Sequence, residues 1–210
     1  MEKFIKLKDT AVPLDAENVD TDQIIPARFL KATDKEGFGE NLFRDWRFDK
    51  SGEPNEDFVL NQDKYSGPIL VAGNNFGCGS SREHAAWAIK AYGFKAVVSS
   101  YFADIFKGNA LNNGVLPVQV SPDFLHKLFI SVERNPDEKI MIDLEEQKIS
   151  ISSSGESESF DIDTYKKTCL INGYDDIDFL TSKLDAIKNY EMKRSGKQAE
   201  PQQTLQTEKI

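Results

Sequence analysis

The sequence predicts an α/β protein with two kinds of sheet. Between residues 68 and 120, short apolar runs alternate with helical patterns in the order strand, helix, strand, helix, strand. That order is typical of a parallel sheet flanked by helices. Between residues 139 and 162, three runs of alternating apolar and polar residues are separated by short polar segments, as in an antiparallel meander. We therefore expect a parallel central sheet and a smaller antiparallel sheet.

The first sixty residues predict strands near the start and irregular structure after them. Residues 4–8 alternate apolar and polar, which indicates a strand, and residues 12–14 continue it after a turn. Residues 18–22 favour a turn, because Asp and Asn side chains bond to nearby backbone. The aromatic-rich stretch from Phe38 to Phe48 predicts a short helix or a loop, and leaves open whether it is core or subunit interface.

The central region predicts three buried strands and two helices. The first helix begins at about Arg82 and stops at Gly93, a residue that suits a helix end. The second places four apolar side chains on one face, namely Phe102, Ile105, Phe106 and Ala110. The strands are expected at residues 68–72, 96–100 and 115–120.

The remaining elements are two more helices, the meander and a last helix. Residues 122–133 form a helix that Ser121 can cap, and residues 163–172 form a helix closed by Gly173. The meander strands are expected at residues 139–144, 148–151 and 159–162, and the last helix at 176–190. We assign residues 1–190 to one domain and expect the polar residues 191–210 to form a disordered tail.

Composition narrows the classes of function. The chain has 210 residues, 39% of them hydrophobic, which is enough to bury a core, and its net charge is −9. An acidic chain is a poor candidate for binding nucleic acid or an anionic membrane through bulk charge. An anionic substrate would therefore need a local basic or dipolar site.

Cysteine and histidine are too few for most metal centres. The chain has Cys78, Cys169, His84 and His126, without a Cys-x-x-Cys motif, so neither a disulfide scaffold nor a bound metal or cluster is expected. His126 lies beside an apolar stripe and is interpreted as a boundary residue rather than a catalytic one. The sequence shows no membrane-length apolar run and no signal peptide, which favours a cytoplasmic protein.

The loop after the strand at residues 68–72 has the features of an anion site. Gly77 and Gly79 allow tight turns, and Arg82 carries a fork of donors suited to a carboxylate or phosphate. Ser80 and Glu83 stand at capping-box spacing before a helical pattern. These features alone fit an anion-binding loop and a well-capped helix equally well.

Residues 77–85 read Gly-Cys-Gly-Ser-Ser-Arg-Glu-His-Ala, which resembles the signature of the swivelling domain of the aconitase superfamily. Three further segments share the resemblance, at residues 18–26, 37–48 and 100–118. Together they resemble the small subunits of bacterial 3-isopropylmalate dehydratases over residues 1–190.

The resemblance implies a three-layer β/β/α fold and a divided enzyme. In this family a large-subunit partner holds a four-iron–four-sulfur cluster, and this chain itself would bind no cofactor. The pair interconverts 2-isopropylmalate and 3-isopropylmalate, small di-acids, by dehydration and rehydration in leucine biosynthesis. No nucleic acid or membrane takes part.

The resemblance also assigns roles to residues of the loop. Ser80 would be the catalytic base, and Ser81 and Arg82 would grip a substrate carboxylate beside backbone of Gly79. Asp22 matches an active-site aspartate of the superfamily. An upstream arginine that holds substrate in aconitase has three candidates here, Arg28, Arg44 and Arg47. Cys78, although inside the signature, is interpreted as a small packed residue.

Several other functions stay open on the sequence. The nearest is a related hydro-lyase acting on citraconate/2-methylmalate or homoaconitate. A phosphate- or nucleotide-binding module is less favoured, because the loop lacks the Gly-Lys-Ser/Thr ending of a P-loop and the spacing of a dinucleotide site. A subunit that serves only for interaction, without catalytic residues, is the third alternative.

Overall fold

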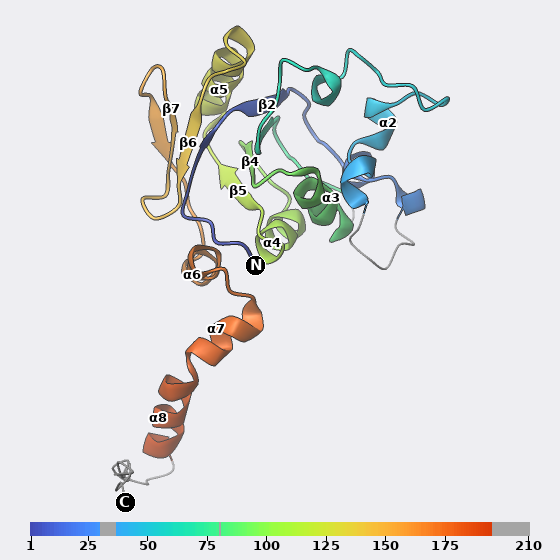
Figure 1. Ribbon diagram of the computed structural model, residues 1–210. Coiled ribbons are helices and arrows are strands. Elements are labelled where there is room, and N and C mark those ends of the chain that lie inside the picture. The colour runs from blue at the N-terminus through green and yellow to red at the C-terminus, as the bar shows by residue number, and fades with distance from the viewer. Residues whose placement is uncertain (30–36, 80, 195–210) are drawn as a thin grey trace, which may run out of the picture.

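The protein is described by a computed structural model over residues 1–29, 37–79 and 81–194 (Figure 1). Its strands form two four-stranded sheets. The parallel sheet has the order β2 (Ala11–Leu14), β3 (Ile69–Ala72), β4 (Ala96–Ser99), β5 (Leu116–Gln119). The antiparallel sheet has the order β1 (Lys6–Asp9), β6 (Ile140–Asp143), β7 (Lys148–Ile151), β8 (Ser157–Ser159). The predicted pair of sheets is confirmed.

The helices connect and cover these sheets. The longer ones are α3 (His84–Tyr92), α4 (Asp104–Asn112), α5 (Pro122–Arg134), α6 (Thr164–Asn172), α7 (Asp176–Ser182) and α8 (Leu184–Arg194). Short turns of helix lie between β2 and β3, namely α1 (Thr21–Ile24), η1 (Ala27–Phe29), η2 (Phe38–Asn41), α2 (Arg44–Arg47) and η3 (Val59–Asn61). The predicted cap of α5 is confirmed, since the Ser121 hydroxyl accepts a hydrogen bond from the Phe124 N–H at 3.2 Å.

Two hydrophobic cores separate three layers, as expected for a β/β/α domain. Alternate residues of the parallel sheet face opposite sides. Ile69 and Val71 of β3 belong to the core shared with the antiparallel sheet and α5. Leu70 and Ala72 belong to the core shared with α3 and α4. Both faces of the parallel sheet are therefore buried, which explains why its strands are continuous apolar runs.

The chain passes from one sheet to the other at Thr10. The strand before it pairs with β6, and the strand after it pairs with β3. We expected one strand that continued after a turn, and the structure instead has two strands in different layers. Gly67 lies against Thr10 so closely that a side chain at Gly67 would overlap the Thr10 backbone, so this crossing point is tightly packed.

The aromatic-rich stretch is core over its first half. Phe38, Leu42 and Phe43 are buried, while Trp46 and Phe48 are half-buried. The helical turn η2 lies directly on the end of α3, because a Cβ built on Gly39 would come within 2.7 Å of the Ala91 backbone. The sequence left open whether this stretch is core or subunit interface. Packing against α3 shows that Phe38 to Phe43 belong to the core.

Three expectations about single elements were wrong. Ile105 is 57% exposed whereas Phe106 is 2% exposed, because the two neighbours point to different sides of the first turn of α4, which begins at Asp104. The last meander strand lies at residues 157–159, two residues earlier than expected, and is followed by the buried Phe160. Helix α3 begins at His84 rather than Arg82.

The C-terminal segment reaches away from the body as two helices (Figure 1). We expected one helix over residues 176–190, and the structure has a break at Lys183, where φ and ψ are −104° and 3°. Helix α8 continues to Arg194, so the first four residues of the expected tail are helical. Residues 195–210 lie outside the described part of the chain.

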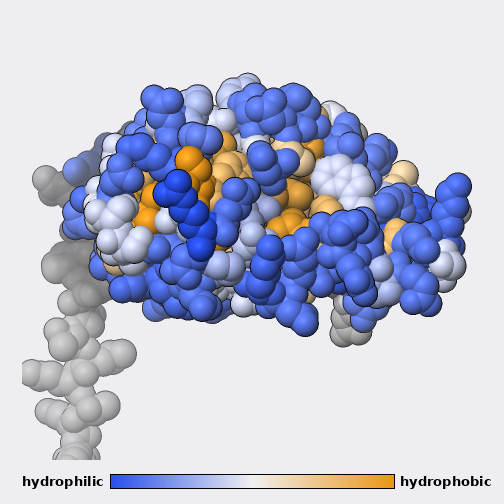
Figure 2. Space-filling model, turned by 90° about the horizontal axis from the view of Figure 1, so that it is seen from above, coloured by the Kyte–Doolittle hydropathy of each residue, from blue (hydrophilic) through white to orange (hydrophobic). Residues whose placement is uncertain are grey.

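The surface is mostly hydrophilic, as the net charge suggests. Figure 2 shows apolar side chains gathered along the middle of one face, between hydrophilic ones. In the residues that the structure describes, no helix is long and apolar enough to cross a bilayer.

Candidate active site

The predicted loop lies at the carboxyl edge of the parallel sheet, where the chain leaves β2, β3 and β4. Its backbone is bonded to both neighbouring loops. The Gly77 N–H donates to the Val19 carbonyl at 2.8 Å, and the Thr21 N–H donates to the Cys78 carbonyl at 2.9 Å. On the other side, the Phe76 N–H donates to the Tyr101 carbonyl at 3.0 Å. Ligand sites of open α/β sheets are found at this edge.

Two glycines make this close docking possible. Gly77 has φ +77° and lies against the Phe106 ring, and Gly79 has φ +92° and lies against the Asp20 carboxylate. A side chain at either position would overlap its neighbour, and it would also be strained at positive φ. The glycines of the loop therefore serve both its conformation and its contact with the segment before α1.

Asp20 organises the segment that receives the loop. Its carboxylate accepts from the Asp22 N–H at 2.6 Å, and its own N–H donates to the Gln23 side chain at 2.8 Å. The bond to Gln23, together with one from the Gln23 backbone N–H to the Asp20 carboxylate, forms a capping box at the start of α1. The expectation that an acidic residue here satisfies its own turn is confirmed for Asp20. The Asp22 carboxylate is left free for another partner.

That partner is Arg82, which forms an ion pair with Asp22. The two side chains are 28% and 50% exposed for Arg82 and Asp22 respectively, so the pair borders solvent. A guanidinium has five N–H donors in a planar fork, more than one carboxylate can use. Arg82 is thus held in place by one carboxylate and retains donors for another anion.

The other predicted site residues are placed beside this pair or fall outside the description. Gly79 and Ser81 are exposed, and they flank Ser80, which lies outside the described residues. Glu83 occupies the N-cap position of α3, and its carboxylate accepts from the Asn113 side-chain amide at 2.8 Å. The capping box predicted for Ser80 and Glu83 depends on Ser80 and so lies outside the described residues.

Cys78 behaves as a packed residue. Its thiol lies 3.2 Å from the Asn18 carbonyl, to which it donates. Burial, reinforced by the negative charge of Asp20, raises the pKa of this thiol above its ordinary value. A thiol that resists ionisation is a poor nucleophile, which agrees with the interpretation of Cys78 as structural.

Two asparagines also fix the loop, Asn18 of the predicted turn and Asn75, for which the sequence predicted no role. Asn18 and Asn75 have φ values of 53° and 59°, a region that Asn tolerates better than most residues. The Asn75 side-chain amide donates to the Asn18 side chain at 2.9 Å. The available signal was the pair Asn74-Asn75 directly after a glycine that ends a strand.

The three candidate upstream arginines have different surroundings. Arg28 forms an ion pair with Asp45, and Arg44 lies over the Phe48 ring at 3.9 Å. Both line a polar hollow of about 850 Å³. Arg47 bonds to the Asn61 side chain at 3.2 Å, and burial lowers the pKa of its guanidinium. Arg47 is therefore a structural residue, while Arg28 and Arg44 face open space.

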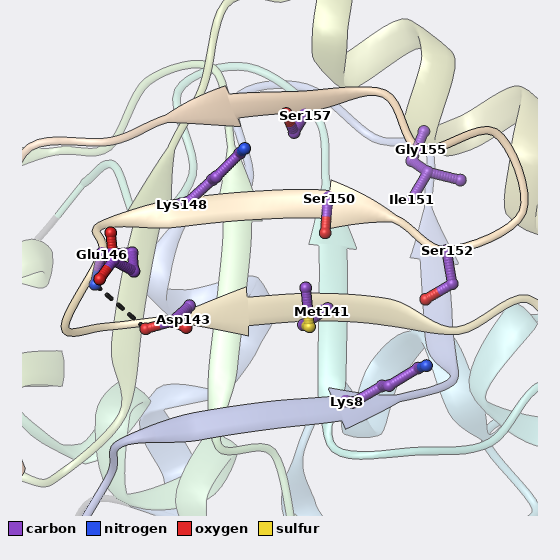
Figure 3. A pocket seen from close by; sticks show the side chains of 10 residues that line it. All are labelled: Lys8, Met141, Asp143, Glu146, Lys148, Ser150, Ile151, Ser152, Gly155 and Ser157. Carbon is purple, nitrogen blue, oxygen red and sulfur yellow. Dashed lines mark hydrogen bonds between the residues drawn. The ribbon is translucent and has the colours of Figure 1, made fainter.

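The outer face of the antiparallel sheet carries a separate hollow of about 380 Å³ (Figure 3). Lys8, Met141, Ser150 and Ser157 form one row across its four strands. This hollow is on the opposite side of the antiparallel sheet from the parallel sheet and takes no part in the loop. His126, expected at the boundary of the apolar stripe, is exposed on α5. Across residues 1–29, 37–79 and 81–194, no group of three or more His, Cys, Asp or Glu could hold a metal ion.

Comparisons with known proteins agree with this geometry. The family model of the aconitase C-terminal domain matches residues 1–123, and a model described as LeuD_N matches residues 126–164. A 3-isopropylmalate dehydratase small subunit of Christiangramia forsetii is 84% identical over 98% of this chain and 100% of its own length. One from Cytophaga hutchinsonii is 64% identical over 91% of this chain and 95% of its own.

A solved structure has the same fold. A 3-isopropylmalate dehydratase (leuD) of Methanocaldococcus jannaschii superposes with a TM-score of 0.62 at 29% identity. The match covers 89% of this chain and 99% of the other.

Proposed function

The chain belongs to the family of 3-isopropylmalate dehydratase small subunits, and on this premise we propose that its carboxyl-edge loop forms one half of a hydro-lyase active site. The enzyme interconverts 2-isopropylmalate and 3-isopropylmalate in leucine biosynthesis, and we place it in the cytoplasm. The other half of the site comes from a large subunit. A four-iron–four-sulfur cluster, expected on that subunit, would supply a Lewis acid for the departing hydroxide.

The ion pair between Asp22 and Arg82 is the observation that carries this proposal. Substrates of this reaction carry two carboxylates, and a bidentate guanidinium is the side chain best suited to hold one of them. Arg82 binds that carboxylate together with the Ser81 hydroxyl and backbone of Gly79. Asp22 acts through Arg82, by keeping the guanidinium at the mouth of the site before substrate arrives.

Ser80 is the base in this proposal. The reaction removes a proton from the carbon next to a carboxylate and later returns one to the neighbouring carbon. A serine hydroxyl can do this only as an alkoxide stabilised by nearby donors. The neighbouring sequence supplies such donors, since Ser80 is two residues before Arg82 and directly after the left-handed Gly79.

Assays of the reconstituted enzyme test these roles. The chain would be measured alone and after anaerobic mixing with its large subunit, on 2-isopropylmalate, citraconate and homoaconitate. We expect activity only in the mixture and highest on 2-isopropylmalate. Activity on none of them, with a competent partner, would contradict the proposed reaction, and preference for another acid would change the substrate.

Replacing the base gives a sharper test. Ser80→Ala should lower turnover by about 10²–10⁴-fold, the usual contribution of a positioned base, while co-purification with the large subunit is unchanged. Ser154→Ala, in an exposed turn of the antiparallel sheet, is the matched control and should turn over normally. Near-normal turnover of Ser80→Ala would show that Ser80 is not the base.

A further inference from the structure

Two successive residues at the start of α3 are bonded to two different helices. Arg82 forms its ion pair with Asp22 of α1. Glu83, the N-cap residue of α3, instead reaches the end of α4, where its carboxylate accepts a hydrogen bond from the Asn113 side-chain amide at 2.8 Å. Helices α3 and α4 lie side by side on one face of the parallel sheet (Figure 1). The cation and the anion, although neighbours in the chain, thus have separate partners.

Asn113 is itself held firmly in place. It is the C-cap residue of α4 and is only 7% exposed. Its side-chain amide also donates to the Asn109 carbonyl at 2.9 Å, and its own carbonyl accepts from the Lys90 ammonium at 2.6 Å. An asparagine amide has two N–H donors, and here one is bonded to its own helix while the other is bonded to Glu83. A buried and fixed donor of this kind can hold a flexible carboxylate in one position.

The bond draws the charge of Glu83 away from the edge of the sheet that carries the loop. Helix α4 starts after β4 and ends shortly before β5 begins at Leu116, so its end lies toward the amino ends of the parallel strands. The substrate of the proposed function carries two carboxylates, one of which Arg82 binds. A carboxylate on the next residue, if not held elsewhere, would compete for the guanidinium and repel the substrate.

We propose that Asn113 is a positioning residue of the active site, which holds the Glu83 carboxylate away from Arg82 so that the guanidinium stays available to the substrate. This inference rests on the proposed function, in which Arg82 binds a substrate carboxylate. Asn113 acts through Glu83 and touches no substrate itself. Its effect on substrate binding therefore depends on the charge at position 83, whereas a merely structural role at the end of α4 does not.

A double-mutant cycle on the complete enzyme, co-purified with its large subunit, tests this dependence. With glutamate at position 83, Asn113→Ala should raise KM for 2-isopropylmalate about tenfold and change kcat by less than about twofold, because the released charge opposes binding rather than chemistry. In a Glu83→Gln background, Asn113→Ala should change KM by less than about twofold, since no charge is then released.

Two further variants complete the test. Glu83→Asp keeps the charge but shortens the side chain beyond the reach of Asn113, so it should raise KM about threefold or more without altering a buried residue. Asn172→Ala is the matched control, because Asn172 at the end of α6 donates to the Thr168 carbonyl at 2.9 Å, as Asn113 does to its own helix. It should leave KM unchanged in both backgrounds. Thermal unfolding of each sample measures the structural cost separately.

Two results would overturn the role of Asn113. One is an equal change of KM by Asn113→Ala in both backgrounds, which would show that the residue only supports the end of α4. The other is a normal KM for both Asn113→Ala and Glu83→Asp. Failure of the proposed function looks different, because Arg82→Lys would then leave the kinetics unchanged. If Arg82→Lys impairs substrate use while the cycle shows no dependence on position 83, only the role of Asn113 is lost.

Discussion

Asp22 and Arg82 lie sixty positions apart in the chain and form an ion pair where the loops after β2 and β3 meet. Asp22 is placed by the short helix α1, whose capping box is built on Asp20. Arg82 is placed by the loop that the same Asp20 contacts through Gly79. One small acidic segment therefore positions both the loop and its guanidinium.

Arg82→Lys should lower kcat/KM for 2-isopropylmalate by about 10- to 100-fold, because a charge-assisted hydrogen bond is worth about 1.5–3 kcal/mol. Lysine keeps the charge but cannot hold a carboxylate with two parallel donors. Steady-state kinetics of the complete enzyme measure the change. Unchanged kinetics would show that Arg82 does not bind substrate.

Asp22→Asn should lower kcat/KM about tenfold, which corresponds to about 1.4 kcal/mol. Most of the change should be a higher KM, because Arg82 loses the charge that orients it while Ser80 is untouched. Asp22→Glu restores the charge and should recover part of the loss. A fall in kcat alone, without rescue by glutamate, would assign Asp22 a direct part in the chemistry. The same assay distinguishes the two outcomes.

Gly79→Ala should abolish substrate binding and destabilise the protein. Its side chain would overlap the Asp20 carboxylate and be held at φ +92°, so the loop must move away from α1. Gly155→Ala is the control, since Gly155 also has positive φ, at +72°, but nothing within 4 Å of the added carbon. Gly155→Ala should lower the free energy of unfolding only by the backbone strain of alanine at positive φ, about 1–2 kcal/mol, and should leave activity intact. Thermal unfolding and KM together separate the two variants.

Cys78 should react slowly with iodoacetamide at neutral pH. Burial and the nearby Asp20 raise the pKa of its thiol above the ordinary value of 9.0, so the reactive thiolate forms only at higher pH. The alkylation rate, followed by mass spectrometry of the peptide, should have its midpoint above pH 9. A midpoint near pH 7 would contradict the packed environment of this residue.

Lys6→Met should lower the free energy of unfolding at neutral pH, and this difference from the wild type should disappear in acid. Lys6 pairs with Asp143 at 2.7 Å and holds the pKa of that carboxyl below its ordinary value of 3.8, with help from the Glu146 N–H (Figure 3). A carboxyl whose pKa is lower in the folded than in the unfolded protein stabilises the fold at any pH above its unfolded pKa. This stability is lost as the pH falls through the pKa of the folded state. Urea unfolding at pH 7 and pH 2 measures the difference.

Lys8→Met is the matched control, on the same strand and face but opposite Met141 rather than a carboxylate. It should show a small effect that does not vary with pH. An equal loss in both variants at pH 7 would mean that general charge balance, rather than the pair with Asp143, sets the stability of this sheet.

The local elements of this protein could be predicted because they depend on neighbours in the chain. The apolar run before Gly73, the cap at Ser121 and the helix end at Gly93 are set by side-chain period and by backbone preference, which a short window contains. The signature from Gly77 to His84 likewise identified the family without any coordinates.

The tertiary structure alone decided which distant residues meet. Nothing local distinguishes Ile105, which is exposed, from Phe106, which is buried, or shows that Thr10 separates strands of two different sheets. Asp22 was a candidate only by resemblance, and its partner depended on how two loops dock through Gly79. The sequence by itself thus determined the elements, the family and the chemical types at the site, since these follow from neighbouring residues. The pairing of Asp22 with Arg82 depended on long-range packing, because only the folded sheet brings its carboxyl ends together.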